Sequence, residues 1–232
     1  MKRVLLKLSG EALARATGEI YDTAFVDEVA GVLFDCAKRG YEIAVVVGAG
    51  NIWRGRQGTE MDRMTADHMG MLATVINALC LKDALVRKGA SATVMTAISM
   101  APFTEGYDPS VAKKYLAEGR IVVFGAGLGI PFVSTDTAGA VRAAEIGADA
   151  ILMAKNIDYI YTADPRVDPT AKRLETISCS EILAKDLRAI DATAAAFCKS
   201  VGMPIRIFGL SSAQDIASAL DEKKSGTLVT PN

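Results

Sequence analysis

Residues 44–55 read Ala-Val-Val-Val-Gly-Ala-Gly-Asn-Ile-Trp-Arg-Gly and carry the strongest indication of the fold. The four apolar residues 44–47 predict a strand that is buried on both faces, as in a parallel sheet covered by helices. Gly48-Ala49-Gly50 predicts a sharp turn whose backbone N–H groups can approach an anion closely. Arg54 follows the turn, and a guanidinium can bind an oxyanion in a bidentate manner. The stretch therefore predicts a phosphate or carboxylate site at the end of a buried strand.

Strand-length and helix-length segments alternate along the whole chain. Apolar periodicity and capping residues predict strands at residues 4–8, 44–47, 91–97, 121–124, 148–154, 203–208 and 227–230. They predict helices between residues 23 and 40, 65 and 88, 108 and 119, 138 and 146, 181 and 185, 191 and 201, and 212 and 220. Residues 11–22 and 102–107 are expected to be irregular, and residues 155–169 to form a functional loop or a short hairpin. The pattern predicts an α/β fold, a three-layer αβα sandwich with a mainly parallel central sheet.

The composition narrows the class of protein. The chain has 232 residues, half of them apolar, and a net charge of -1, so it can bury a large core but has no basic surface for nucleic acid or membranes. None of the four cysteines has C-x-x-C spacing, which argues against a zinc site and a redox pair and fits the cytoplasm. The apolar N-terminal segment is too short for a signal peptide and is interrupted by Lys7. No apolar run approaches the length of a membrane span.

Four polar or glycine-rich segments follow predicted strands, at residues 7–10, 48–54, 125–136 and 155–164. Ligands of such folds bind at the carboxyl ends of the strands, so these segments are expected to meet in one crevice. Two familiar nucleotide motifs are absent. The chain has no Gly-Lys dipeptide, which excludes a Walker A loop, and the G-x-G-x-x-G pattern fails at Trp53 and at Ile130. Bound phosphates must therefore be held by other means.

Each of these residues also has a purely structural interpretation. Residues 48–54 can be a plain strand-to-helix turn, Lys7 a solvated lysine, and Asp136 and Asp191 helix caps. Residues 162–165 can be an ordinary turn, and His68, the only histidine, fits a structural role. The functional interpretation depends on the convergence of the segments.

Five motifs in this order resemble one family. They are Lys-Leu-Ser-Gly at 7–10, Gly-Ala-Gly-Asn-Ile-Trp-Arg-Gly at 48–55, Asp-His-Met-Gly-Met-Leu-Ala-Thr at 67–74, Pro-Phe-Val-Ser-Thr-Asp at 131–136 and Tyr-Thr-Ala-Asp-Pro at 161–165. Together they are similar to the bacterial UMP kinases (uridylate kinases) of the amino acid kinase superfamily, over essentially the whole chain. The 67–74 run is specific to UMP kinases, whereas the first and last motifs are shared across the superfamily.

The resemblance implies a single amino acid kinase domain over residues 1–232, with a UMP-binding lobe at about 1–150 and an ATP-binding lobe at about 151–232. It implies transfer of the γ-phosphoryl group of ATP to UMP, giving UDP and ADP, in de novo pyrimidine nucleotide biosynthesis. Mg²⁺ would be carried with ATP, without a separate protein metal site. The resemblance also implies a cytoplasmic homohexamer in which the 65–88 helix takes part in a dimer interface, with UTP as feedback inhibitor and GTP as a common activator.

The resemblance also assigns roles to individual residues. The catalytic residues would be Lys7, Arg54, Asp136 and Asp191. ATP would be bound by Lys7, Leu8, Ser9, Gly10, Gly50, Arg54, Asn156, Tyr161 and Asp164. UMP would be bound by Gly48, Ala49, Asp67, Leu128, Gly129, Ile130, Pro131, Phe132, Val133, Ser134 and Thr135, with Asp67 holding the ribose. The chain departs from the family at Leu128 and Ile130, where threonine and asparagine are common, and at Ala49, where glycine is usual.

Other functions of the same fold remain alternatives. One is a superfamily kinase that acts on carbamate, aspartate, glutamate or acetylglutamate, against which the 67–74 run argues. A second is a non-catalytic nucleotide-binding storage protein, and a third is a regulatory nucleotide sensor. Phosphoryl transfer to a phosphate acceptor needs positioning and charge neutralisation but no general base, which fits the chain's lack of a candidate catalytic histidine or cysteine.

Overall fold

Strand β1 (Arg3–Leu8) lies inside a nine-stranded sheet with the order β4-β3-β5-β2-β1-β6-β10-β11-β9. The computed structural model describes residues 1–15, 18–53, 60–163, 167–221 and 226–232. The other strands of the sheet are β2 (Glu42–Val47), β3 (Ala92–Thr96), β4 (Glu105–Gly106), β5 (Ile121–Gly125), β6 (Ala150–Lys155), β9 (Thr176–Ser178), β10 (Ile205–Gly209) and β11 (Thr227–Thr230). All neighbours pair in parallel except β10 and β11. The predicted mainly parallel sheet is confirmed.

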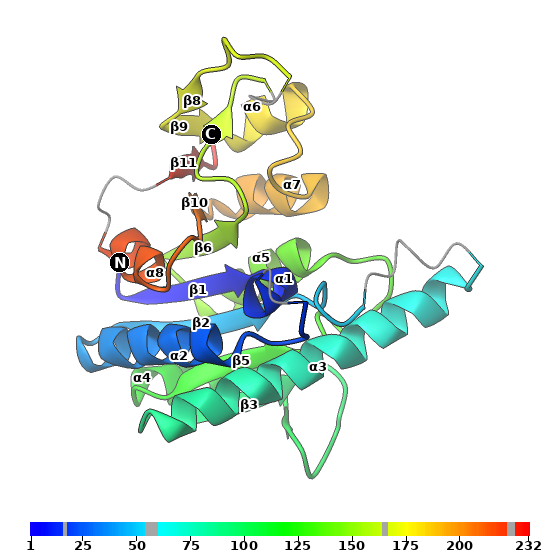
Figure 1. Ribbon diagram of the computed structural model, residues 1–232, viewed down its shortest axis with the longest axis vertical. Coiled ribbons are helices and arrows are strands. Elements are labelled where there is room, and N and C mark those ends of the chain that lie inside the picture. The colour runs from blue at the N-terminus through cyan, green and yellow to red at the C-terminus, as the bar shows by residue number, and fades with distance from the viewer. Residues whose placement is uncertain (16–17, 54–59, 164–166, 222–225) are drawn as a thin grey trace.

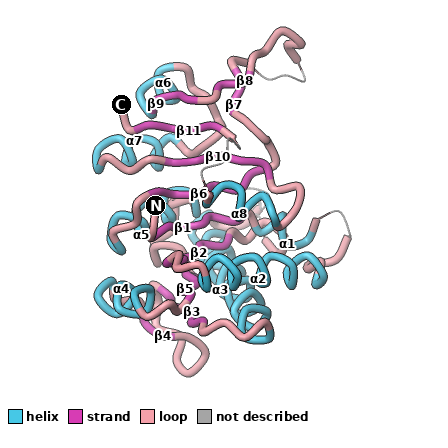
Figure 2. The backbone as a smooth tube through the Cα atoms, turned by 90° about the vertical axis from the view of Figure 1, so that its left-hand side faces the viewer, coloured by secondary structure: helices cyan, strands magenta, loops and turns pink. Residues whose placement is uncertain are grey.

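Helices cover both faces of the sheet (Figure 2). One face carries α1 (Gly10–Ala14), α2 (Thr23–Lys38), α3 (Arg63–Arg87) and α8 (Gln214–Leu220). The other face carries α4 (Pro109–Ala117), α5 (Thr135–Ile146), α6 (Cys179–Ala184) and α7 (Ala192–Val201). Every residue of β2 and β5 is buried, because helices remove both faces of these strands from water. The three predicted layers are thus present.

The longest helix, α3, extends well beyond the sheet at its N-terminal end (Figure 1). By length and composition alone this helix could cross a membrane. No apolar segment of that length was expected from the sequence. Half of that apolar window is buried inside the fold, where Ala78, Leu81 and Leu85 join the core over β2 and β5. Burial against the sheet accounts for this apolar composition.

Several boundaries differ from the predictions, each for a local reason. Residues 10–14 form α1 rather than an irregular segment, because Leu13 is fully buried and fixes the turn. Helices α2 and α3 begin at Thr23 and Arg63, because Asp22 and Asp62 accept the backbone N–H bonds of the first turn. The segment 102–107, predicted as a loop, contains the two-residue strand β4.

The segment after β6 forms the predicted hairpin, although it is longer than expected. Its two short strands, β7 (Ile160–Tyr161) and β8 (Arg173–Leu174), pair in an antiparallel manner. Asp164 lies between them, outside the described residues. The hairpin stands beside β10 and β11 at the end of the sheet that carries α6 and α7 (Figure 2).

Candidate active site

The turns after β1 and β2 are in direct backbone contact. The two strands end in register, with Leu8 opposite Val47, and the Gly48 N–H donates to the Leu8 carbonyl at 2.9 Å. A Cβ atom at Gly10 would lie 2.5 Å from Asn51 Oδ1 and 2.6 Å from the Gly48 carbonyl oxygen. Only glycine fits at position 10 without displacing the second turn. Two of the predicted phosphate-facing segments therefore meet.

A buried carboxylate lies between two lysines at the centre of the molecule. Asp136 Oδ1 is 2.8 Å from Lys7 Nζ, and Asp136 Oδ2 is 2.6 Å from Lys155 Nζ. The lysines lie at the carboxyl-terminal ends of neighbouring strands, β1 and β6, and Asp136 lies in the first turn of α5. Gly139 of α5 faces β1, where an added Cβ would make ordinary contacts, at 3.4 Å from Leu5 and 3.9 Å from the Lys7 stem.

Burial and charge in this cluster shift the pKa values of Asp136 and Lys155. Burial by itself would raise the pKa of Asp136, but the charges of Lys7 and Lys155 outweigh burial and lower the pKa from 3.8 to about 2. For Lys155 burial dominates and lowers the pKa of its ammonium group, although Asp136 acts in the opposite direction. The carboxylate therefore stays ionised at neutral pH and holds two cations at the strand ends.

Asp191 connects α7 to the start of α5. Its carboxylate accepts the Ser134 hydroxyl at 2.7 Å and the Thr137 hydroxyl at 2.5 Å, and it also caps α7 through the Thr193 N–H. The α5 cap is Ser134, which leaves Asp136 to the lysines. The capping interpretation thus applies to Asp191, whereas Asp136 has no part in the α5 cap. Asp191 fixes the turn that carries Asp136.

An apolar cavity of about 410 Å³ lies on one side of the cluster. Six predicted acceptor-side residues line it, namely Ala49, Asp67, Leu128, Ile130, Val133 and Thr135, together with Gly50, Trp53, Met71 and Thr74. The Asp67 carboxylate accepts the Phe132 N–H at 2.8 Å and the Arg63 Nε–H at 3.0 Å. Gly48, Gly129 and Pro131 belong to the backbone around this cavity rather than to its lining. A site of this size suits a small organic ligand.

Side chains of α3 and α5 hydrogen-bond to the loop that follows β5, next to this cavity. Thr74 Oγ1 accepts the Ala126 N–H at 2.8 Å, and the buried Arg142 donates to the Gly127 carbonyl at 3.3 Å. Ala126 and Phe132 adopt left-handed φ values of 60° and 67°, which are unfavourable for side chains other than glycine. The tethers from α3 and α5 compensate for this strain and fix the loop.

A larger cavity, of about 1150 Å³, lies on the other side of the cluster. The predicted donor-side residues Asn156 and Tyr161 line it, with Lys155, Tyr159, Phe208 and Asp215. A third cavity, of about 420 Å³, is lined by Lys7, Asp136, Lys155 and Asp191 and shares lining residues with the larger cavity. A fourth cavity, of about 250 Å³, shares lining residues with the third cavity and with the apolar one. Leu8 is buried in the core, so only its backbone can face a ligand. Arg54, predicted as a catalytic and ATP-binding residue, lies outside the described residues.

The sequence interpretation missed two residues of this arrangement. The predicted strand 148–154 stops one residue short of Lys155, which is the last residue of β6. Arg142 interrupts the apolar face of a predicted helix, which is the usual sign of a buried and paired charge.

Comparison with known proteins agrees with this arrangement. The profile of the amino acid kinase family matches residues 2–209. The chain belongs to the amino acid kinase family. It is 47% identical over 231 residues to the uridylate kinase of Mycolicibacterium vanbaalenii. The alignment covers 98% of this chain and 91% of that protein.

Two solved structures are similar over the full length of this amino acid kinase. The UMP kinase of Bacillus anthracis has a TM-score of 0.95 and 34% identity, covering 100% of this chain and 96% of that one. The UMP kinase of Ureaplasma parvum has a TM-score of 0.93 and 34% identity, covering 99% and 98%.

The contact between the two turns predicts that Gly10→Ala separates them and lowers turnover by at least ~10²-fold, the scale for misplacing reacting groups by about 1 Å. The matched control is Gly31→Ala in α2, where a Cβ meets nothing within 4 Å. That change should leave turnover unchanged and stabilise the helix slightly. Steady-state kinetics and urea unfolding of both variants test this, and equal turnover in the two would contradict it.

Proposed function

We propose that this chain is a UMP kinase, which transfers the γ-phosphoryl group of ATP to UMP and gives UDP and ADP. The observation that carries the proposal is the Lys7–Asp136–Lys155 cluster, which lines a cavity between the apolar cavity and the larger cavity, each of a size that suits a nucleotide. The full-length similarity to uridylate kinases supports it further. The acceptor nucleotide would occupy the smaller cavity within residues 1–150, and ATP the larger cavity within residues 151–232.

The two lysines would neutralise the charge that spreads over the transferred phosphoryl oxygens. Lys7 and Lys155 reach this position from neighbouring strands, and Asp136 fixes both ammonium groups before substrate binds. The N–H groups of Ser9, Gly10, Ala49 and Gly50 would add fixed dipoles that need no reorganisation. Arg54 would contribute a bidentate cation between donor and acceptor, and Asp164 a contact on the ATP side. Asp191 would act by holding the start of α5.

The residues present fit a divalent cation that arrives with the nucleotide. Within the described residues, no group of three or more His, Cys, Asp or Glu side chains suits a metal ion. Both oxygens of Asp136 are ion-paired with lysines. A kinase of this type requires a divalent metal, and we propose Mg²⁺ bound mainly by phosphate oxygens, where it would neutralise charge on ATP.

The acceptor would be selected by shape and by backbone groups. Leu128 and Ile130 are apolar, so the base edge would be contacted by the main chain of residues 127–130. Asp67 would accept a ribose hydroxyl, since it lines the cavity while the Phe132 N–H holds it in place. The phosphate of UMP is already ionised, so the reaction needs no general base at the site.

The proposed activity predicts ATP-dependent formation of UDP by the purified chain. UMP, CMP, dUMP and carbamate should be compared side by side in a coupled assay that detects ADP, with UDP identified by chromatography. UMP should give the highest kcat/KM, and dUMP a raised KM because the ribose contact with Asp67 is missing. Phosphorylation of carbamate alone would support another kinase of the superfamily, and nucleotide binding without turnover a storage protein or a sensor.

The cluster predicts unequal stability effects for two substitutions. Asp136→Asn leaves both lysine ammonium groups without this counter-charge and should cost about 3–5 kcal/mol of unfolding free energy. Lys155→Met leaves the charge-balanced Lys7–Asp136 pair in place and should cost less than Asp136→Asn. Both should lower kcat by at least ~10²-fold. Urea unfolding and steady-state kinetics check this, and a Lys155→Met variant with normal kcat would remove Lys155 from the mechanism.

The pH dependence of the cluster's stability follows from the direction of the pKa shift of Asp136. The pKa of Asp136 is lowered from 3.8 to about 2, so its stabilisation is complete above about pH 4 and is lost as the pH falls toward 2. Asp136 is therefore ionised throughout an assay between pH 5 and 8.

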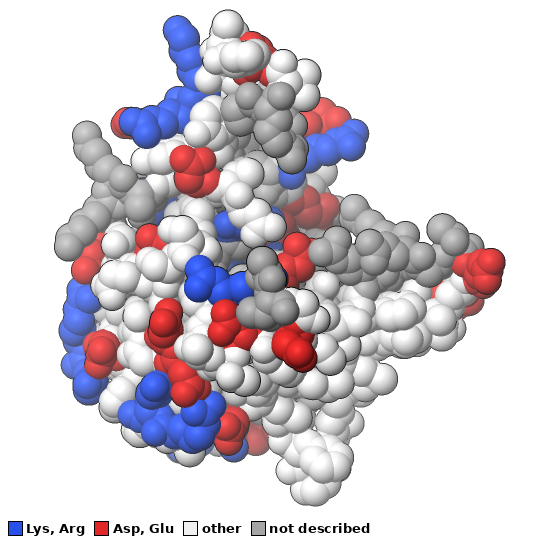
Figure 3. Space-filling view, viewed as in Figure 1, with Lys and Arg blue, Asp and Glu red and all other residues white. Residues whose placement is uncertain are grey.

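We also propose a cytoplasmic homohexamer that UTP inhibits, with α3 in a subunit interface. Leu72 and Ile76 are one turn apart on α3 and are 54% and 52% exposed, and Phe103 on the neighbouring loop is 74% exposed. Figure 3 shows a broad uncharged surface over α3 and this loop. Such a surface is typical of subunit contacts.

The interface proposal predicts that Leu72→Glu reduces the oligomer measured by light scattering after size-exclusion chromatography. Val167→Glu is the control, since Val167 is 82% exposed in the hairpin beyond β7, away from α3. It should leave the mass unchanged. An unaltered mass for Leu72→Glu would place the interface elsewhere.

A further inference from the structure

A fully buried amide connects α3 to the turn after β2. Asn77 is 0% exposed, and its Nδ2 donates to the Gly48 carbonyl and to Asn51 Oδ1, both at 2.7 Å. Its Oδ1 accepts from the Tyr21 hydroxyl at 2.8 Å and from Asn51 Nδ2 at 3.1 Å. The side chain thus uses two donor hydrogens and two acceptor positions. A buried amide that is fully hydrogen-bonded fixes its neighbours in a single arrangement.

The neighbours of Asn77 are the groups that set the separation of the two turns. The Gly48 carbonyl oxygen and Asn51 Oδ1 are also the atoms that lie closest to Gly10, where no Cβ fits. Asn51 is further anchored by its Nδ2, which donates to the Ile20 carbonyl at 2.9 Å. Any movement of the Gly48–Asn51 turn toward or away from Gly10 must therefore break bonds to Asn77.

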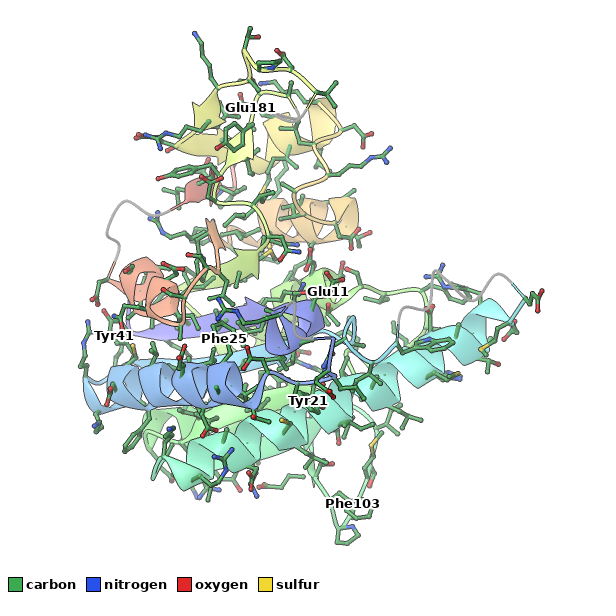
Figure 4. The ribbon with its side chains drawn as sticks, in the orientation of Figure 1. Glu11, Tyr21, Phe25, Tyr41, Phe103 and Glu181 are labelled. Carbon is green, nitrogen blue, oxygen red and sulfur yellow. The ribbon has the colours of Figure 1, made fainter. Side chains whose placement is uncertain are left out.

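Tyr21 is the remaining hydrogen-bond partner of Asn77. It precedes α2 in the sequence and lies beside α3 in Figure 4. Burial, with a smaller effect of Cys80, raises the pKa of Tyr21 to about 12, so its hydroxyl remains a donor at neutral pH. The Gly48 carbonyl can only accept, so it fixes the Asn77 amide with Nδ2 toward the turn, and the Tyr21 hydroxyl then donates to Oδ1.

We propose that Asn77 is a positioning residue for phosphoryl transfer, which acts through Gly48 and Asn51 to hold the acceptor-side turn against the donor-side turn at Gly10. The inference rests on the proposed kinase function of this site. In-line transfer depends on the separation of donor and acceptor, whereas the binding of each nucleotide depends mainly on its own cavity. Loss of Asn77 therefore affects kcat more than the KM for UMP or ATP.

The test compares three variants at a temperature where each is folded by circular dichroism. Asn77→Asp keeps the shape but loses both donor hydrogens, and Asn77→Ala removes the whole network. Leu81→Ala is the matched control, because Leu81 is fully buried one turn further along α3 and touches the core rather than the turn. It is expected to destabilise the fold by a similar or larger amount.

For both Asn77 variants we expect kcat to fall at least about tenfold, with each KM within about threefold of the parent. Leu81→Ala should keep the parent's kcat while lowering the urea midpoint. Tyr21→Phe should give a smaller loss than Asn77→Ala, because the bonds from Nδ2 to the turn remain. Normal kcat in Asn77→Ala, or an equal loss in Leu81→Ala, would overturn the inference.

Hydrogen exchange separates this outcome from failure of the proposed function. Peptides that cover residues 47–53 should exchange faster in Asn77→Ala and at the parent's rate in Leu81→Ala, whatever reaction the chain catalyses. If the parent makes no UDP, the kinase proposal fails while exchange still tests the network. If the parent makes UDP and exchange in this segment is unchanged, the positioning role of Asn77 is wrong.

Discussion

The buried carboxylate of Asp136 between two ammonium groups is the interaction on which the rest of the site depends. A lysine at the end of a central strand is expensive to bury unless a counter-charge is present. One acidic residue here serves two lysines from neighbouring strands. Asp191 lines the same cavity as this cluster, and its charge also favours the ammonium form of Lys155. The carboxylates therefore stabilise the buried cations before any ligand binds. Because α5 carries the carboxylate, whatever holds the start of α5 also sets the position of both cations.

Close backbone approach is the second constraint, and it explains Gly10. A Cβ atom at this position would overlap the turn of residues 48–51, so only glycine allows the two turns to touch. Side chains from α3 and α5 then hold the loops from behind, as Asn77 does for one turn and Arg142 for the loop at Gly127. The site is preorganised by packing as much as by its charged groups.

Periodicity was sufficient to predict the layers, because β2 and β5 are continuous apolar runs and α2 has a regular apolar face. Motif resemblance then indicated the family. The short elements could not be predicted: α1 depends on the burial of Leu13 and β4 on pairing with β3, and neither is a property of the local sequence. The partners of individual side chains were equally inaccessible. The sequence places Lys155 directly after a predicted strand, but only the pairing of β6 with β1 places it near Asp136.

Polar residues on the apolar faces of predicted helices are a feature of the sequence that indicates the supports of the site. Asn77 lies on the face of α3 that also contains Leu81 and Leu85, where an amide is unfavourable unless all its hydrogen bonds are made. The same holds for Arg142 in α5, whose guanidinium packs 3.6 Å from the Tyr107 ring and bonds Glu145 at 2.7 Å. Each such residue lies behind a loop of the site rather than in a cavity. A buried polar side chain on an otherwise apolar helix face therefore marks the loop that the helix supports, even where the residues that touch the ligand are recognised by motif alone.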